Sequence, residues 1–300
     1  MIKSVTVTNH LGKSIKLEMR FPEKSGFFIS SIDGLGPAHA NINMSELATS
    51  DGSKFNSARL NSRNIVLNLG FLGVDIESVR LMSYKYFPIK KQVKLLFETD
   101  SRRCEIYGNV ESNEPNIFSE RESTQISIVC PDPYFYSTKT AITYFSGLEP
   151  VFEFPFSNES LTENLLEMGR ILVNQEQTVW YDGDADVGIV IYIHALGDVV
   201  NPIITNSLTR EVMRIDTTKL EAITGHGIIA GDDIIISTVR GQKYIRLLRD
   251  GEYINILNCL EKNSDWFQIS QGDNVFSFTA DEGGTKLQFR IENRIVYDGV

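Results

Sequence analysis

The stretch "QISIVCPDPYFYS", Gln125–Ser137, lies near the middle of the 300-residue chain and decides how the chain is organised. Ile126 and Ile128 alternate with polar residues, which is typical of a strand with one buried face. Pro131 and Pro133 then end the strand, because neither can donate a main-chain hydrogen bond and each favours extended backbone in the residue before it. The pattern predicts a stiff interdomain hinge. The predicted hinge residues are Pro131, Asp132, Pro133, Tyr134, Phe135 and Tyr136.

The charge balance changes close to the same point. Residues 1–135 carry 16 Lys and Arg against 15 Asp and Glu, whereas residues 136–300 carry 13 against 24, so the net charges are +1 and −11. A chain of this length has a prior of about two domains. We therefore predict an N-terminal domain over 1–137 and a C-terminal domain over 138–300. The acidic total argues against nucleic acid and against an anionic membrane surface as partners.

The N-terminal half has the pattern of an α+β domain. "SVTVTN" and "SIKLEM" alternate apolar and polar residues around the turn "HLGK", which predicts a β-hairpin. One short helix is expected from Asp75, a capping residue, to Tyr84, and Pro88 stops it. Further short strands precede the proline pair.

The C-terminal half is more uniformly β. Turn pairs such as Asp182–Gly183, Gly231–Asp232 and Asp250–Gly251 separate strands of four to eight residues, which favours a β-sandwich or jelly roll. The segment "NESLTENLLEMGR" has helical propensity but only partly fits a helical face, so its structure stays open. The chain as a whole is predicted to be mainly β.

The cysteines, Cys104, Cys130 and Cys259, are odd in number and form no CxxC motif. Buried free thiols in a protein folded in a reducing cytosol are the better interpretation. The N-terminus lacks the pattern of a secretory signal, and no apolar run approaches the ~18 residues of a membrane span.

Residues suited to catalysis form no recognisable pattern. His10, His39, His194 and His226 are not neighbours and do not have metal-ligand spacing. The motifs of serine hydrolases, zinc proteases, P-loops and dinucleotide sites are absent, and "GLG" at Gly34–Gly36 is too short to hold a phosphate. We expect no enzyme and no cofactor, although a carboxylate pair assembled by the fold stays an open alternative.

Three alternating aspartates, Asp182, Asp184 and Asp186, resemble the first ligands of a calcium loop. However, Val187 stands where such a loop needs glycine, and Ile193 stands where it needs glutamate. A solvated turn is the preferred interpretation, so no metal site is expected.

Aromatic residues are concentrated around the predicted boundary. We favour packing in a seam between the two domains, with contacts between subunits as the alternative. The eight residues are Tyr134, Phe135, Tyr136, Tyr144, Phe145, Phe152, Phe154 and Phe156.

Eight segments of the sequence, taken in their order along the chain, resemble those of distal tail proteins (Dit) of long-tailed phages. The N-terminal segments are "RNIVLNLGFL", "VRLMSYKYFP", "SRRCEIYGNVES" and "ISIVCPDPYFY". The C-terminal segments are "YDGDADVGIVIYIHALGDVVNPIITN", "GDDIIISTVRGQKYIRLLRDGEYINILNCL", "SDWFQISQGDNVFSFTA" and the final "YDGV". Each segment is weak evidence alone, and their order is specific.

The resemblance implies a structural virion protein at the tail tip, synthesised in the host cytoplasm. In that family an N-terminal domain forms a six-membered ring and a galectin-like β-sandwich projects outward. The implied partners are further copies of the chain, the tail tube protein, the tail-tip or tail-associated hydrolase protein, and receptor-binding proteins. Phages and prophage particles of Gram-positive hosts are the usual setting.

A carbohydrate-binding adhesion module for host attachment is the alternative function. A galectin-like domain would bind sugar through a cluster of histidine, arginine and tryptophan. The C-terminal half offers His194, His226, Arg240, Arg246 and Trp266, but these residues form no compact local motif.

Overall fold

The structure, a computed structural model, describes residues 1–46, 51–150, 169–173 and 176–300. The chain divides into two compact units: unit 1 comprises Met1–Thr138 with Val296–Val300, and unit 2 comprises Lys139–Ile295. The predicted boundary lies one residue before this division. The last five residues belong to unit 1, whereas the sequence analysis assigned them to the C-terminal domain.

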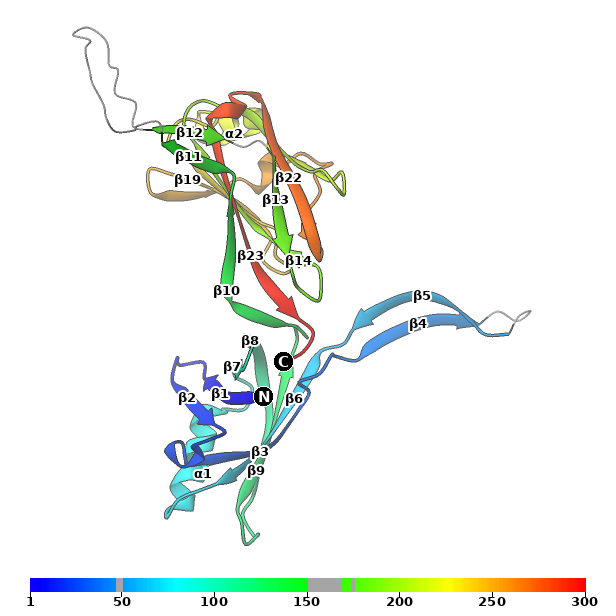
Figure 1. Ribbon diagram of the computed structural model, residues 1–300, viewed down its shortest axis with the longest axis vertical. Coiled ribbons are helices and arrows are strands. Elements are labelled where there is room, and N and C mark those ends of the chain that lie inside the picture. Colours follow the sequence, from blue (N-terminus) through cyan, green and yellow to red (C-terminus); the bar gives the residue numbers. More distant parts are fainter. Residues whose placement is uncertain (47–50, 151–168, 174–175) are drawn as a thin grey trace, which may run out of the picture. The chain divides into compact units, whose positions relative to one another are not determined.

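Unit 1 is built on one antiparallel sheet (Figure 1), with the strand order β2-β1-β7-β8-β9-β6-β3. The start of a further strand, β10, pairs with β8. The bounds are β1 Ile2–Thr8, β2 Ser14–Glu18, β3 Phe27–Asp33, β6 Arg63–Phe71, β7 Gln92–Thr99, β8 Arg103–Asn116, β9 Ser123–Cys130 and β10 Phe135–Tyr144, with a 3₁₀ turn η1 at Pro22–Lys24.

Alternation along these strands produces the core of unit 1. Ile65, Leu67 and Leu69 of β6 are fully buried, and so are Leu95 and Phe97 of β7. Apart from the buried Gly70, their neighbours in sequence are more exposed, as the two-residue period of a strand requires. The alternation of apolar and polar residues that predicts these strands therefore also identifies their buried face.

Among the described residues of unit 1, the one α-helix is α1, Ile76–Tyr86. Its N-cap is Asp75, whose side chain accepts a hydrogen bond from the amide of Ser78 at 3.1 Å. Val79 and Met82 pack against the buried core. The predicted helix is confirmed and extends two residues past Tyr84, ending before Pro88.

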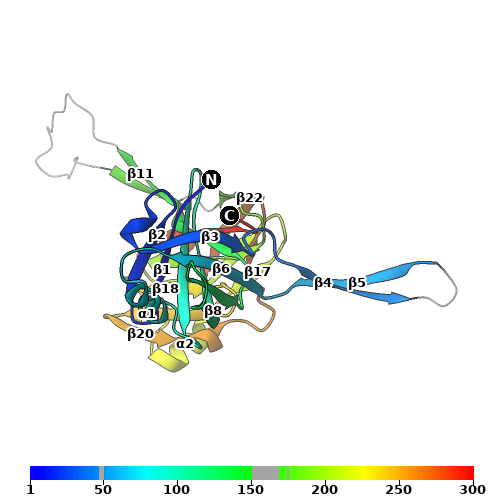
Figure 2. The ribbon, with the colours of Figure 1, turned by 90° about the horizontal axis from the view of Figure 1, so that it is seen from below.

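A separate two-stranded hairpin is inserted in the chain between β3 and β6, which pair directly with each other. Its strands, β4 (Ala40–Glu46) and β5 (Ser53–Leu60), pair only with each other among the described strands. Figures 1 and 2 show the hairpin extending away from the sheet of unit 1.

Unit 2 contains two main antiparallel sheets. One has the order β10-β23-β15-β18-β19-β20 and the other β13-β22-β16-β17, while β11 pairs with β12 and β14 with β21. The bounds of one sheet are β15 Val190–Ala195, β18 Asp233–Ser237, β19 Tyr244–Arg249, β20 Glu252–Asn255 and β23 Leu287–Tyr297. Those of the other are β13 Glu176–Tyr181, β16 Val200–Asn206, β17 Val212–Arg214 and β22 Gly272–Glu282. The short pairs are β11 Ser146–Pro150, β12 Gly169–Val173, β14 Val187–Gly188 and β21 Gln268–Ile269, and the 3₁₀ turns are η2 Leu257–Cys259 and η3 Gly284–Lys286.

Side chains from the two sheets of unit 2 pack together in its core. Phe278 of β22 stacks on Phe289 of β23 with ring centroids 3.7 Å apart, and Phe145 meets Phe278 edge-on at 4.5 Å. This is the two-layer packing of a β-sandwich. The prediction of a mainly β chain is confirmed.

A second helix, α2 (Thr217–Thr224), was not predicted from the sequence. Asp216 caps it by accepting hydrogen bonds from the amides of Thr218 and Lys219, and Gly225 ends it in the left-handed conformation. The first residue of the helix is held by Asn201 of β16, whose side-chain oxygen accepts a hydrogen bond from the amide of Thr217 at 2.9 Å.

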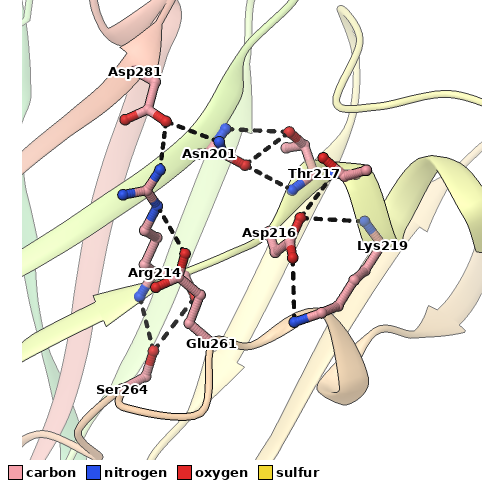
Figure 3. Close-up of polar contacts among 9 residues, drawn as sticks. Asn201, Arg214, Asp216, Thr217, Lys219, Glu261, Ser264 and Asp281 are labelled. Atoms are coloured by element: carbon pink, nitrogen blue, oxygen red, sulfur yellow. Dashed lines mark hydrogen bonds and ion pairs between the residues drawn. The ribbon is translucent and has the colours of Figure 1, made fainter.

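The end of β17, just before α2, is tied to β22 by an ion pair (Figure 3). Arg214 lies between two carboxylates, 3.1 Å from Glu261 and 2.5 Å from Asp281. Asn201 donates to Asp281 at 2.8 Å, and Ser264 donates to and accepts from the backbone of Arg214. The segment "NESLTENLLEMGR", whose structure the sequence left open, lies largely outside the described residues.

Candidate functional site

The predicted hinge residues lie within unit 1, just before its division from unit 2. β9 ends at Cys130, and the Asp132 carboxylate then accepts hydrogen bonds from the amide of Tyr134 at 3.2 Å and the hydroxyl of Tyr136 at 2.6 Å. β10 begins at Phe135. Pro131–Tyr134 therefore connect the two strands, with Asp132 holding the connection, whereas Phe135 and Tyr136 already belong to β10. The role of these six residues as a hinge remains a prediction.

The strongest polar cluster near this turn was missed by sequence reasoning. Arg63, 4% exposed, donates from Nε to the carbonyl of Pro133, from Nη1 to the carbonyls of Gly34 and Gly36, and from Nη2 to the carbonyl of Asp298. The contacts to Pro133, Gly34 and Asp298 each measure 2.6 Å. Burial lowers the pKa of the Arg63 guanidinium.

This cluster joins three segments that are far apart in the sequence. The guanidinium also lies over the ring of Phe135, 4.5 Å from its centroid. Gly34 has a φ of +84°, and an added Cβ would come within 2.0 Å of the Asn64 carbonyl, so only glycine fits there. The "GLG" stretch is thus a carbonyl cradle for an arginine of its own chain.

The C-terminal residues complete the same region of unit 1. The Val300 amide donates to the Leu35 carbonyl at 3.1 Å, and Arg102 lies 4.5 Å from the centroid of the Tyr297 ring. Arg102 also donates to the carbonyl of Gly299 at 3.3 Å. A signal for this return is not present in the local sequence pattern, because it depends on carbonyls whose positions the fold sets.

The β4–β5 hairpin of unit 1 has an apolar face and a polar face. Ile42 pairs with Ala58, and Met44 pairs with Phe55 after a register shift that gives β5 one extra residue, so these four side chains lie on one side. Ile42, Met44 and Phe55 are 53%, 55% and 60% exposed. The other side is polar, with pairs such as Asn41 and Arg59.

The exposed apolar face of this hairpin is suited to contact with a partner. Two strands alone are marginally stable in water, and large apolar side chains gathered on one exposed face mark an interaction surface. The hairpin is therefore a candidate surface for assembly.

Of the four histidines, one has a charged partner at close range. The Nδ1 atom of His194 lies 2.7 Å from Oδ1 of Asp233, on the exposed face of the β15–β18 pair. His10, His39 and His226 are exposed. This pair lines a cavity of about 460 Å³ in unit 2.

The five residues considered for sugar binding are not gathered in that cavity. His194 contributes to its wall, but His226, Arg240, Arg246 and Trp266 do not. Trp266 instead lies under Lys243, whose ammonium is 5.0 Å from the ring centroid. Of the residues considered for sugar binding, only His194 is a wall residue. Tyr144 was named only as a boundary aromatic, and Tyr192 and Tyr253 were missed.

The carboxylates singled out in the sequence have different surroundings. Asp182, Asp184 and Asp186 are exposed, and among the described residues no group of three or more His, Cys, Asp or Glu side chains is arranged to hold a metal ion. Asp232, in contrast, is buried and pairs with Arg249, whose Nε and Nη2 donate to its two oxygens at 2.8 and 2.5 Å. That ion pair raises the pKa of Arg249.

The three cysteines are free and buried, as predicted. Burial raises the pKa of Cys104 to about 11 and that of Cys130 to about 12, and it also raises the pKa of Cys259. With pKa values of about 11 and about 12, the Cys104 and Cys130 thiols are protonated at neutral pH, the state in which a thiol is a poor nucleophile.

The aromatic residues around the boundary do not share one location. Phe135 is in the core of unit 1, where it meets Phe97, and Phe145 is in the core of unit 2. For these two residues, the prediction of a common seam is corrected. Phe152, Phe154 and Phe156 lie outside the described residues.

Comparison with known proteins gives matches at the level of structure. No protein-family model and no curated protein match the sequence. Within the described chain, neither helix is long and apolar enough to cross a membrane.

The SPP1 Dit protein, described as a paradigm of the hub adsorption apparatus in phages that infect Gram-positive bacteria, matches with a TM-score of 0.66 and 12% identity, over 97% of this chain and 99% of that chain. A chain of the phage P2 baseplate in its activated conformation with calcium matches with a TM-score of 0.49 and 10% identity, over 98% of both chains. The same baseplate with strontium gives 0.45 and 9%, over 97% of both chains. The chain therefore has the fold of the SPP1 Dit protein, and the resemblance to distal tail proteins is confirmed at the level of the fold.

Proposed function

We propose that this chain is a structural hub protein of a phage tail, in which unit 1 assembles into a closed, six-membered ring and no reaction is catalysed. The observation that carries the proposal is the similarity to the SPP1 Dit protein, which extends over 97% of this chain. In this proposal the ring connects the tail tube to the tail tip and its associated hydrolase, and unit 2 holds receptor-binding components in a virion or prophage particle.

The charge of unit 1 supports assembly from identical copies. Adding Asp298 to the 15 acidic residues of 1–135 gives 16, which equals the 16 Lys and Arg, so unit 1 has no net charge. Identical neutral subunits can pack side by side without long-range repulsion. Unit 2, with 13 basic and 23 acidic residues, has a net charge of −10, which favours a soluble domain outside the ring.

The hairpin supplies the contact that we assign to the neighbouring copy. Its exposed face carries Ile42, Met44 and Phe55, and residues 40–60 contain two acidic and two basic side chains. A neutral, amphipathic hairpin fits the neutral surface of a second copy of unit 1 better than it fits a charged partner.

The test is the assembly state of the purified chain, measured by negative-stain electron microscopy and mass photometry, alone and mixed with tail tube protein. We expect six-fold rings. The variant I42S/M44S/F55S should lose them, whereas the matched variant N41S/N43S, changed on the polar face, should keep them. Rings that persist in the first variant would exclude the hairpin as the contact. If the wild-type chain forms no ring, either alone or mixed with tail tube protein, the proposed function is wrong.

A further inference from the structure

The cavity on the exposed face of one unit 2 sheet has the residues of a small-molecule site. Its volume of about 460 Å³ lies within the range of about 300–1,000 Å³ that is typical of such sites. The wall is formed by Tyr144, Tyr192, His194, Asp233, Ile235, Leu248, Tyr253, Gln288, Phe289 and Arg290. None of these residues belongs to the region of unit 1 described above.

Strand register places much of this wall in one row. Gln288 pairs with His194, His194 with Asp233, Asp233 with Leu248, and Leu248 with Tyr253. The row therefore crosses five neighbouring strands, from β23 to β20, and Tyr144 lies on β10 at the β23 edge. Strands lie about 4.8 Å apart, so the lining extends over roughly 20 Å. That length suits an extended ligand of several linked units.

The polar groups of the row are arranged for hydroxyl groups. Asp233 accepts at two oxygens, of which Oδ1 faces His194 Nδ1 at 2.7 Å, and the amide of Gln288 can both donate and accept. The side chains of His194 and Asp233 are 42% and 43% exposed, so each has room for a ligand. Neighbouring hydroxyls, each a donor and an acceptor, match such a set.

Aromatic rings lie at both ends of the cavity wall and in its middle. Tyr144 and Tyr253 are 56% and 62% exposed. The ring of Tyr192 is covered on one face by the Arg290 guanidinium, 4.1 Å from its centroid. Exposed aromatic faces beside polar groups favour a ligand that has both C–H faces and hydroxyl edges.

The charges in the wall disfavour an anionic ligand. Arg290 is paired with Glu292 at 3.1 Å, so its positive charge is largely compensated, and Asp233 adds a negative charge. The surrounding unit has a net charge of −10. Phosphorylated, sulfated or carboxylated ligands would therefore be repelled.

We propose that this cavity binds a neutral oligosaccharide, with Tyr144 and Tyr253 contacting sugar rings and Asp233, His194 and Gln288 bonding their hydroxyls. The proposal does not depend on ring assembly by unit 1, so the two can fail separately. It also replaces Trp266 as the aromatic residue to test for glycan binding.

The full-length chain is applied to an array of neutral and anionic oligosaccharides, and lactose, maltotriose, N,N′-diacetylchitobiose and the strongest array ligand are titrated by calorimetry. We expect saturable binding of at least one neutral ligand. Tyr144→Ala and Tyr253→Ala should each weaken it at least tenfold, and Asp233→Asn should weaken it as well. Circular dichroism melting curves confirm that each variant is folded.

Trp180→Ala is the matched control, because Trp180 is 65% exposed and lies on β13 of the other sheet. Binding should be unchanged in this variant and in Trp266→Ala. The proposal is overturned if no neutral oligosaccharide binds, if only anionic glycans bind, or if Trp180→Ala weakens binding as much as Tyr253→Ala. A site that binds only a protein segment gives the first of these results.

Discussion

Arg63 holds together three parts of unit 1 through hydrogen bonds to four backbone carbonyls. We expect Arg63→Met to lower the free energy of unfolding of unit 1 by about 3 kcal/mol or more, because each of the four carbonyls loses a charged donor and a buried unsatisfied carbonyl costs about 1–3 kcal/mol. Chemical denaturation followed by circular dichroism measures this loss. Arg63→Lys should recover only part of it, since an ammonium cannot reproduce the planar fork.

The exposed Arg59 on the hairpin is the matched control for that experiment. Arg59→Met should change the free energy of unfolding by less than about 0.5 kcal/mol. An equal effect of the two substitutions would show that the carbonyl cradle does not stabilise unit 1.

The buried thiols of unit 1 predict a loss of stability at alkaline pH. The pKa values of Cys104 and Cys130 rise from an ordinary 9.0 to about 11 and about 12 because both side chains are buried. A thiol whose folded pKa is raised stabilises the fold fully below the unfolded value, and this contribution is lost as pH rises through the folded value. The window is therefore pH 9 to 12.

The measurement is the free energy of unfolding at pH 8 and pH 10.5 for the wild type and for C104A/C130A. We expect the wild type to lose more stability over this interval than the variant, because each unit of pKa difference corresponds to about 1.4 kcal/mol. Identical losses would mean that the unfolded-state thiols do not contribute.

At the scale of elements, α2 depends on its cap more than on its own sequence. Among the described residues of the helix only Thr217 and Leu220 are buried, and Thr and Ile are poor helix formers. Asp216→Ala should lower the free energy of unfolding of unit 2 by about 1 kcal/mol, since the amides of Thr218 and Lys219 lose their acceptor. Thermal melts and hydrogen exchange of the helix measure the effect.

Asp216→Asn is the informative partner variant, because asparagine also caps helices. It should retain most of the stability, although it gives up the charge pair with Lys219 at 3.2 Å. If asparagine destabilises unit 2 as much as alanine does, the ion pair and not the cap holds the helix.

The two helices show which elements a local sequence pattern can predict and which it cannot. α1 was predictable because a capping aspartate, an apolar face and a stopping proline all lie within the same 14 residues, 75–88. α2 lacks a clear apolar face and is fixed by partners such as Asn201, which are distant in sequence. Strands were predictable for the same reason as α1, since alternation is local.

The candidate sites depend on a different kind of information. Arg63 reaches carbonyls of residues 34, 36, 133 and 298, and the row across the unit 2 sheet takes one side chain from each of five strands. Neither the Arg63 cluster nor the row has a recognisable spacing in the sequence. Strand register brings the members of the row together, and the return of the C-terminal residues to unit 1 completes the Arg63 cluster. His194 was noted as a candidate only for its residue type.

At the scale of the whole molecule, unit 1 is made from two separate pieces of chain. Val296–Val300 supply the Asp298 carbonyl to Arg63, the Tyr297 ring to Arg102 and the Val300 amide to Leu35. Because the chain crosses the division between the units twice, the stability of unit 1 should depend on residues that follow all of unit 2.

Deleting residues 296–300 therefore tests the division directly. We expect the deletion to speed hydrogen exchange around Arg63 and residues 34–36 and to lower the melting temperature of unit 1 by several degrees, as a loss of about 1–3 kcal/mol predicts for a unit of this size. Exchange in the core of unit 2, around Phe278 and Phe289, should be unchanged. The double variant that combines the deletion with Arg63→Met should lose less than the sum of the two single losses, because both remove the same hydrogen bond to Asp298. Strict additivity would mean that the deletion does not act through the hydrogen bond to Arg63. A loss confined to unit 2 would assign these residues to the second domain, as the sequence analysis predicts.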